Sequence, residues 1–219
     1  MTYLLEHELD RLKKRLLTLT AEVEESVQRA TKALASRNVE LAQKVVAGDE
    51  RIDNLEVELE EECLKALALH QPVAIDLRLI VVILKMNNDL ERIADLSVNI
   101  AERAIALAAE PAIDPPFDVD AMSRQVVLML EKSLNALVDA DINKAREVLI
   151  LDDAVDEFHR DNYQRIKERL RVAVDEIDPV FNYLAVSRHL ERIADLATNI
   201  AEDVIYLRSG AIIRHKPVS

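Results

Sequence analysis

A seven-residue segment, LERIADL, occurs twice in this chain, at Leu90–Leu96 and again at Leu190–Leu196. In each copy the same four residues, NIAE, follow after a gap of two, beginning at Asn99 and at Asn199. The two copies lie 100 residues apart in a chain of 219 residues. This spacing predicts two similar halves, each of which folds around the same pattern of buried and exposed side chains.

The composition indicates that both halves are helical. The chain has two glycines and six prolines, and aromatic residues make up 3% of it, while hydrophobic residues make up 50%. These are few turn-forming and strand-forming residues for a sheet protein, whereas the abundant Leu, Ala, Glu, Lys and Arg favour helices. The predicted fold class is therefore all-α.

Apolar spacing and boundary residues divide the first half into three helices. Apolar residues from Leu5 to Val27 recur every three or four positions, which predicts one long helix that packs against partner helices. Asn38 is a suitable N-cap for a second helix, and Pro72 is a favoured first-turn residue for a third that ends near Ala109. Three prolines then fall within residues 110–118, which we interpret as a linker.

The second half repeats this order. Helices are predicted over Val119–Asp139, from the N-cap candidate Asp141, and from Asp178–Pro179. We therefore expect two tandem, quasi-symmetric, antiparallel three-helix bundles. Their expected bounds are residues 1–109 and 119–209, with the linker at 110–118 between them and a C-terminal tail at 210–219.

Charge and residue usage exclude several classes of protein. The formal net charge of −13 argues against a nucleic-acid partner, because phosphate contacts need a basic face. Cys63 is the single cysteine, so no intrachain disulfide can form, and a reducing compartment is expected. The longest apolar run, Leu79–Leu84, is far too short to span a bilayer. We expect a cytoplasmic protein without membrane insertion that docks peripherally, if at all, at the inner face of the membrane.

Acidic residues recur at helical spacing on two helices of each half. One stripe lies on the third predicted helix and its repeat on the sixth, where residues four and seven apart share a face: Glu91, Asp95, Asn99 and Glu102, repeated as Glu191, Asp195, Asn199 and Glu202. A second stripe lies on the helix before each of these: Asp49, Asp53, Glu56 and Glu60, matched by Asp152, Asp156, His159 and Tyr163. Consecutive helices are usually antiparallel neighbours, so each half is expected to bring two stripes face to face.

Facing carboxylates repel one another, which predicts either neutralisation by nearby arginines or bound cations. Carboxylate oxygens favour hard ions such as Fe(III), Mg²⁺, Mn²⁺ or Ca²⁺, and the nitrogen of His159 leaves zinc or nickel open for the second half. For any single acidic pair, a solvated face with salt bridges is the simpler interpretation. The recurrence on two helices of both halves favours a metal site.

The segments VVAGDERID at Val45–Asp53, Gln71–Glu102 and RHLERIADLATNIAE at Arg188–Glu202 resemble the PhoU family, regulators of bacterial phosphate uptake. The chain departs from the family at Ala94 and Ala194, where glycine is common. The resemblance implies multinuclear iron or other metal clusters, with zinc, nickel, manganese or magnesium as alternatives. It implies ligands at D/E-xxx-D motifs, namely Asp49, Asp53, Glu91, Asp95, Asp152, Asp156, Glu191 and Asp195. Additional candidate ligands are Asn99, Glu102, Asn199, Glu202 and His159.

The same resemblance implies a non-enzymatic negative regulator of the phosphate regulon. Its expected partners are the ATPase of the phosphate ABC transporter, a sensor histidine kinase and a second copy of the chain in a homodimer. Two alternatives are open at this point. One is a ferritin-like di-metal carboxylate enzyme, for which Asp156-x-x-His159 is the one suitable spacing. The other is a helical adaptor that binds no metal.

Overall fold

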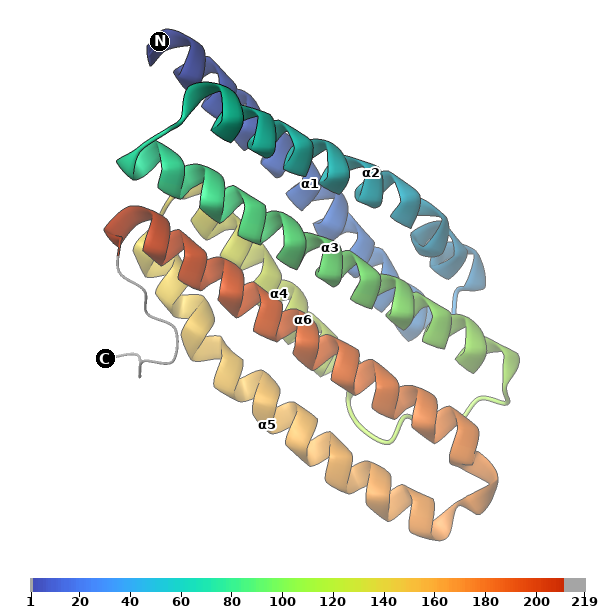
Figure 1. Ribbon diagram of the computed structural model, residues 1–219. Coiled ribbons are helices and arrows are strands. Elements are labelled where there is room, and N and C mark those ends of the chain that lie inside the picture. The colour runs from blue at the N-terminus through green and yellow to red at the C-terminus, as the bar shows by residue number, and fades with distance from the viewer. Residues whose placement is uncertain (1, 211–219) are drawn as a thin grey trace.

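The computed structural model describes residues 2–210 of the chain. Within this range six α-helices follow one another, with one short 3₁₀-helix, η1, before the last (Figure 1). Their bounds are α1 Thr2–Ser36, α2 Val39–His70, α3 Ala74–Ala109, α4 Val119–Asp139, α5 Ile142–Val172, η1 Val174–Glu176 and α6 Ile177–Ser209. The all-α prediction is confirmed. The expected tail falls almost entirely outside the described residues.

Two of the predicted helix starts are capped as the sequence indicates. The side chain of Asn38 accepts a hydrogen bond from the backbone N–H of Leu41 at the start of α2. Asp141 accepts from the backbone N–H groups of Asn143 and Lys144 at the start of α5. Both side chains satisfy amide groups that have no partner within the helix.

Two further predicted starts, those of α3 and α6, are wrong by one or two residues. Pro72 lies buried in the connection before α3. The helix begins only at Ala74, because Val73 before it has an extended backbone. On the α6 side, the 3₁₀-helix carries the chain directly into a helix that begins at Ile177, so Asp178 lies inside the first turn and does not cap it. Pro179 occupies that first turn, where its missing N–H costs nothing.

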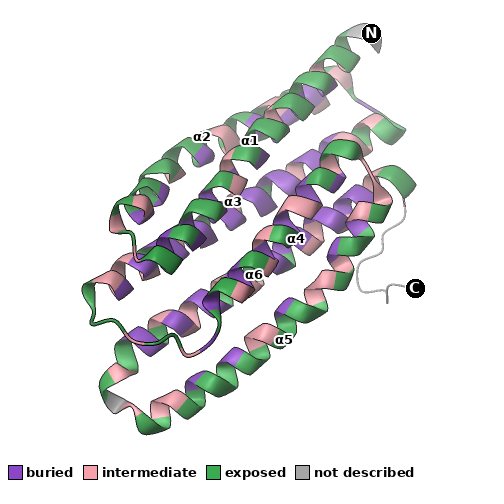
Figure 2. Ribbon diagram, turned by 180° about the vertical axis from the view of Figure 1, so that it is seen from behind, coloured by how far each residue is buried: buried purple, intermediate pink, exposed green. Residues whose placement is uncertain are grey.

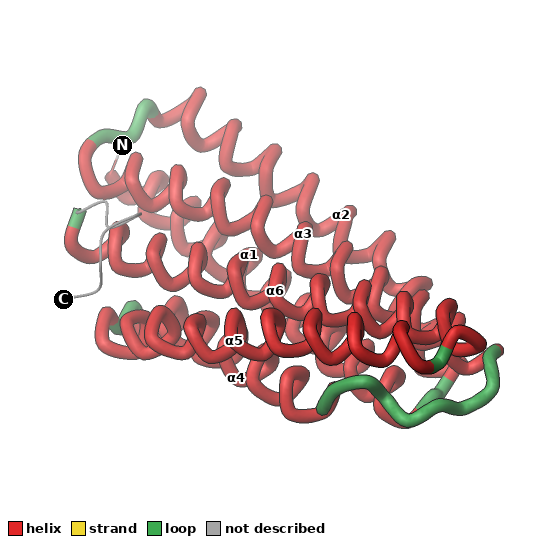
Figure 3. The backbone as a smooth tube through the Cα atoms, turned by 90° about the horizontal axis from the view of Figure 1, so that it is seen from below, coloured by secondary structure: helices red, strands yellow, loops and turns green. Residues whose placement is uncertain are grey.

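Each half of the molecule is a bundle in which all three helices contact one another, α1 with α2 and α3, and α4 with α5 and α6. The halves meet mainly along α3 and α6, with a smaller contact between α1 and α4. In Figures 1 and 3 the helices α2, α3, α6 and α5 lie side by side as one layer, with α1 and α4 behind it. Among the described helices, the seam between α2 and α3 is thus covered by α1 on one side only, and the seam between α5 and α6 by α4.

The repeated segment LERIADL divides its residues between the core and the surface. In the first copy Leu90, Ile93 and Ala94 are buried in α3, and in the second their equivalents are buried in α6. The acids at positions two and six of the segment are half-buried and exposed, respectively, in both copies. Figure 2 shows buried residues concentrated along these two central helices, with more exposed surface on α2 and α5. The apolar residues therefore fix α3 and α6 in the core and leave their acids at its edge.

Candidate metal centre

The first acidic cluster lies between α2 and α3 and consists of Asp49, Asp53, Glu56, Glu91 and Asp95. Burial raises the pKa of the Asp49 carboxyl, and the negative charges of Asp53 and Asp95 raise it further. Burial is also the main cause of the raised pKa of Glu91, followed by the charges of Asp95, Glu56 and Asp53. The two stripes therefore face each other across the seam, as the sequence pattern predicts.

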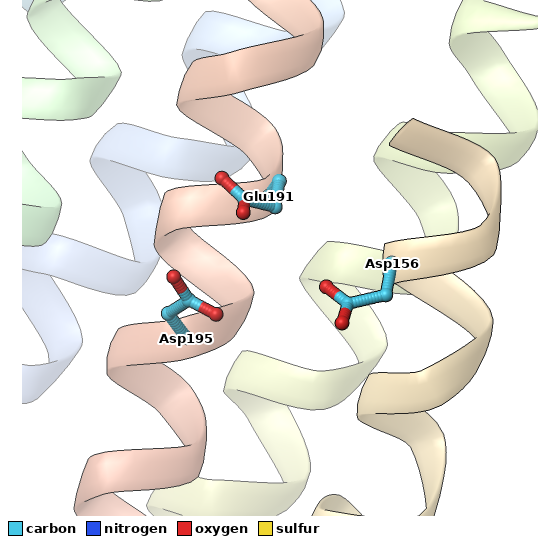
Figure 4. A group of neighbouring side chains, drawn as sticks. All are labelled: Asp156, Glu191 and Asp195. Carbon is cyan, nitrogen blue, oxygen red and sulfur yellow. The ribbon is translucent and has the colours of Figure 1, made fainter. Parts of the chain in front are cut away.

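The second acidic cluster lies between α5 and α6 and consists of Asp152, Asp156, Glu191 and Asp195. Burial and the charge of Asp156 raise the pKa of Asp152 to about 6. Burial and the charge of Glu191 raise the pKa of Asp195 to about 6. Oxygen atoms of Asp156, Glu191 and Asp195 lie within 4.8 Å of one another, with Asp156 reaching across from α5 toward the two acids of α6 (Figure 4). This spacing allows several carboxylates to contact one cation.

Facing residues in both seams form rungs, and the first two rungs are the same in the two halves. Rung 1 is Asp49 with Asp95 in the first half and Asp152 with Asp195 in the second. Rung 2 is Asp53 with Glu91, and Asp156 with Glu191. In each half, the four residues of rungs 1 and 2 are all acidic. The two antiparallel seams therefore concentrate negative charge at equivalent places.

One oxygen atom in each half is left without a partner at the same position. Oδ1 of Asp49 and Oδ1 of Asp152 are both buried, and neither accepts a hydrogen bond from the residues that the structure describes. Burying such an oxygen without a partner is unfavourable, by about 1–3 kcal/mol or more when it is charged. A bound cation would remove this penalty, so the residues fit a metal with oxygen ligands. This fit is the observation that supports a bound metal.

Arginines do not neutralise the clusters within residues 2–210. The charges of Arg92 and Arg192 lower the pKa of Glu91 and Asp195, but in each case as the smallest effect, and both arginines are exposed. Among the residues that the structure describes, no lysine or arginine nitrogen forms an ion pair with the rung carboxylates; the pairs found involve other acids. The alternative to metal binding, in which salt bridges to arginines neutralise the acidic stripes, is therefore not found among the described residues.

The next pair along each seam, rung 3, differs between the halves. In the first half Asn87 donates to the carboxylate of Glu56 at 2.7 Å. In the second half the residues at these positions are Ser187 and His159, and Oγ of Ser187 lies 3.0 Å from Nδ1 of His159. Tyr163 is exposed and its ring lies under the ammonium group of Lys167. The sequence pattern missed Asn87 and Ser187, although each lies one helical turn before Glu91 or Glu191 on the same stripe.

The remaining candidate ligands lie further along the two central helices. Asn99 is half-buried and donates to the backbone oxygen of Asp95 at 2.8 Å. Asn199 and Glu202 are half-buried and Glu102 is exposed. None of these four belongs to the group of three carboxylates within 4.8 Å. Their part in metal binding stays a prediction.

The sequence pattern of the PhoU domain matches residues 5–104 and 119–204, one match in each half. The chain belongs to the PhoU family. It is 41% identical to the phosphate-specific transport system accessory protein PhoU homolog of Aquifex aeolicus, over 96% of both chains. It is 34% identical to PhoU homolog 1 of Thermotoga maritima, over 94% of this chain and 89% of that one.

Two solved PhoU structures have the same fold. The crystal structure of PhoU from Pseudomonas aeruginosa matches with a TM-score of 0.92 at 36% identity, covering 94% of this chain and 99% of that one. The phosphate transport system regulatory protein PhoU from Streptococcus pneumoniae matches with a TM-score of 0.82 at 30% identity, covering 95% and 98%. The family resemblance and the arrangement of two PhoU domains are therefore confirmed.

Membership of this family also settles the question of enzymatic activity. The relatives are named as accessory and regulatory proteins, and PhoU proteins are non-enzymatic. The alternative of a ferritin-like di-metal enzyme is therefore wrong. The structure gives a physical reason, because such enzymes direct their ligands into the bundle core, whereas Asp53, Asp95, Asp156 and Asp195 are exposed at its edge.

None of the described helices is long and apolar enough to cross a membrane.

Proposed function

We propose that this protein is a negative regulator of phosphate uptake and of the phosphate regulon. It would couple the ATPase of a phosphate ABC transporter to a sensor histidine kinase, from the cytoplasm at the inner face of the membrane. The observation that carries this proposal is the family match over both halves, together with relatives named as accessory proteins of phosphate-specific transport. A non-enzymatic regulator of this kind would act by binding its partners.

We further propose that the two acidic clusters bind metal ions, most simply multinuclear iron. Asp49, Asp53, Glu91 and Asp95 would hold metal in the first half, and the second acidic cluster would do so in the second. The support is the pair of unpartnered oxygens at equivalent positions and the raised pKa values of the facing acids. Bound metal would supply the positive charge that offsets this repulsion.

The position of the clusters suggests how metal would affect partner binding. Helix α1 covers one side of the α2–α3 seam and α4 one side of the α5–α6 seam, so the exposed acids lie on the opposite side. The layer of α2, α3, α6 and α5 in Figure 3 would thus present both clusters to one side. Cations that join α2 to α3 and α5 to α6 would hold this layer rigid and reduce its negative charge. We therefore propose the layer of α2, α3, α6 and α5 as the docking surface for partners.

Affinity capture from phosphate-replete cells tests the regulatory role. We expect the wild-type chain to recover the transporter ATPase and the kinase, and a chain carrying Asp53→Asn and Asp156→Asn to recover at least about tenfold less of both. Glu157→Gln is the matched control, because Glu157 is an exposed acid next to Asp156 that lies outside the rungs. Recovery of neither partner by the wild-type chain would contradict the regulatory proposal.

Elemental analysis separates metal binding from the remaining alternative of a metal-free adaptor. The chain would be purified without a chelating tag, and its metal content measured before and after substitution of Asp53 and Asp156. We expect metal that is lost from the double variant and kept in Glu157→Gln. Partner recovery by a wild-type chain that contains no metal would instead support the adaptor.

A further inference from the structure

A groove of about 500 Å³ lies at the end of the molecule where α1 and α3 begin and α6 ends. We call it the terminal groove. Its lining includes residues of α1 and α3 from the first half, and residues of α6 and the C-cap of α4 from the second. Figure 1 shows these helix ends together at one end of the molecule. A segment that fills the terminal groove would therefore contact both halves at once.

The apolar part of this lining is incompletely covered by the described residues. Leu9 is buried, and Leu79 and Leu207 are half-buried. Ile75, in the first turn of α3, is 65% exposed. An apolar side chain placed against these four would remove hydrocarbon surface from water, which is favourable. The terminal groove therefore favours an occupant with apolar side chains.

The polar part of the lining carries a net negative charge. Three acids, Glu6, Asp10 and Asp76, stand against two cations, Lys13 and Arg208. Asp10 pairs with Lys13 at 3.4 Å. Within residues 2–210, no lysine or arginine forms an ion pair with either of the other two acids. An occupant that brings positive charge would complement them.

The chain leaves α6 beside the terminal groove. Gly210 is the C-cap of this helix, with a φ of 72°, and its N–H donates to the backbone oxygen of Tyr206 at 2.8 Å. A Cβ at position 210 would lie 2.9 Å from Nη1 of Arg78 on α3. The positive φ and this close approach both favour glycine. They bring the chain against α3 about one helical turn from Ile75.

The segment that follows Gly210 has the composition that the terminal groove favours. Residues 211–219 read AIIRHKPVS, with two adjacent isoleucines followed by Arg214 and Lys216 and no acid. This is a positive segment in a chain whose formal net charge is −13. At about 3.3–3.6 Å per residue, Ile213 can lie up to about 10 Å from Gly210. The isoleucines are therefore within reach of the groove that begins at the last turn of α6.

We propose that residues 211–219 bind in the terminal groove of their own chain. The pair Ile212–Ile213 covers Ile75 and its apolar neighbours, and the positive charges of Arg214 and Lys216 lie beside the acids of the groove. The segment continues from the second half, whereas most of the groove belongs to the first. Its binding therefore ties the two halves together at this end of the α3–α6 contact, independently of any metal.

Disulfide cross-linking in the full chain tests the position of this segment. Ile213→Cys is combined with Ile75→Cys or with the control Leu77→Cys, which lies on the same turn of α3 but outside the groove lining. The native Cys63 is buried, so the introduced thiols are the accessible pair. With oxidised glutathione, we expect the Ile75 pair to close within one chain at least about tenfold faster than the Leu77 pair. Equal rates overturn the proposal, and so does a bond that forms only between two chains, since the occupant is then a second copy.

Reversing the charges of the segment tests the electrostatic part. Arg214→Glu with Lys216→Glu should slow closure of the Ile75 pair at least about threefold at low ionic strength and leave the Leu77 pair unchanged. Raising the salt concentration should reduce this difference, because salt screens the repulsion between the new acids and the groove. Identical closure rates before and after charge reversal would contradict the proposed contact with the acids.

Hydrogen exchange tests the effect on the contact between the halves without added cysteines. Ile212→Asp with Ile213→Asp removes the apolar groups of the segment and changes no residue of the described helices. Amides of residues 74–79, at the start of α3, should exchange at least about threefold faster in this variant. Residues 177–182, at the start of α6, lie outside the terminal groove and should keep their rates. Unchanged exchange at residues 74–79 overturns the proposal.

Discussion

The two halves of this protein share a scaffold and differ in the polar groups attached to it. The repeated LERIADL segments place their apolar residues in the core of α3 and α6 and their acids at equivalent positions along the two seams. Two rungs of carboxylates are therefore the same in both halves. At rung 3, Glu56 with Asn87 is replaced by His159 with Ser187. Duplication thus preserves the packing and the paired acids, while the polar side chains next to those acids differ between the halves.

The contact between the halves shows the same principle of shared packing and different charges. Near the start of α3, Lys85 forms an ion pair with Asp203 of α6, which is 2% exposed. At the equivalent place on the other side, Arg103 donates to Asn182 at 3.3 Å, and its Nε is buried without a partner. One end of the α3–α6 contact is a charge pair and the other end carries a positive charge held by a neutral amide.

The largest expected effect concerns these two ends. Lys85→Met removes one cation that pairs with the buried carboxylate of Asp203, and we expect it to lower the free energy of unfolding by about 3 kcal/mol, because this hydrogen bond is charge-assisted and its acceptor is buried. Arg103→Met removes a cation that donates to the neutral amide of Asn182, and it should cost less than about 1 kcal/mol. Thermal unfolding should show a difference of roughly 4–8 °C between the variants. Equal losses would mean that the two ends are energetically equivalent.

The next effect tests whether the two seams bind metal independently. Asp152→Asn with Asp156→Asn removes two ligands from the second cluster and should weaken metal binding there by at least about 100-fold, which is about 2.7 kcal/mol. Asp49→Asn with Asp53→Asn should do the same in the first half. Equilibrium dialysis with one metal should show half of the wild-type capacity in each double variant. Loss of all binding in either one would indicate a single shared site.

The fold was predictable from the sequence because its signals are local and repeated. The scarcity of glycine, the apolar spacing and the caps at Asn38 and Asp141 indicate six helices and two of their starts. The starts near Pro72 and Asp178 differ from the observed ones by one or two residues, because an extended residue precedes α3 and a 3₁₀-helix precedes α6, and neither leaves a clear sequence signal. Element boundaries depend on connections between helices, which local propensity describes poorly.

The sequence predicts that the acidic stripes face each other, because the antiparallel arrangement of neighbouring helices determines which turns meet. It does not predict how far the acidic side chains are buried or which groups they contact. Spacing alone does not show that one oxygen of Asp49 and one of Asp152 are enclosed without a hydrogen bond. Nor does it show that Ser187 is held by Asn162 and Met122, since those two residues lie 25 and 65 positions away in the chain. Such contacts depend on the packing of three helices together.

The pH dependence of stability should distinguish the second seam from the rest of the surface. Because the pKa of Asp195 rises to about 6 on folding, the folded protein keeps a proton that the unfolded chain loses near pH 4. The stability of the metal-free protein should therefore fall as pH increases from about 4 to 7. Asp195→Asn removes this penalty and should raise stability at pH 8 by about 1 kcal/mol, a value reduced for partial solvation. At pH 4 the substitution should have little effect.

Denaturant unfolding of the metal-free protein at both pH values provides the measurement. Glu157→Gln is the control, because Glu157 is exposed on α5 outside the rungs and should change stability equally little at pH 4 and pH 8. Addition of metal at pH 8 should cancel the advantage of Asp195→Asn, since a cation offsets the same repulsion in the wild-type chain. A gain that persists in saturating metal would show that the carboxylate of Asp195 does not contact the ion.

The smallest expected effect compares the caps of the equivalent helices α2 and α5. Asp141 accepts from two backbone N–H groups and carries a negative charge at the positive end of the helix, whereas Asn38 accepts from one and is neutral. We expect Asp141→Ala to cost about 1 kcal/mol and Asn38→Ala about half as much. Raising the salt concentration should reduce the cost of the Asp141 substitution and leave that of Asn38 unchanged, because salt screens the interaction of the charge with the helix end. Denaturant unfolding at low and high salt measures both, and a salt-independent cost at Asp141 would show that its hydrogen bonds alone stabilise α5.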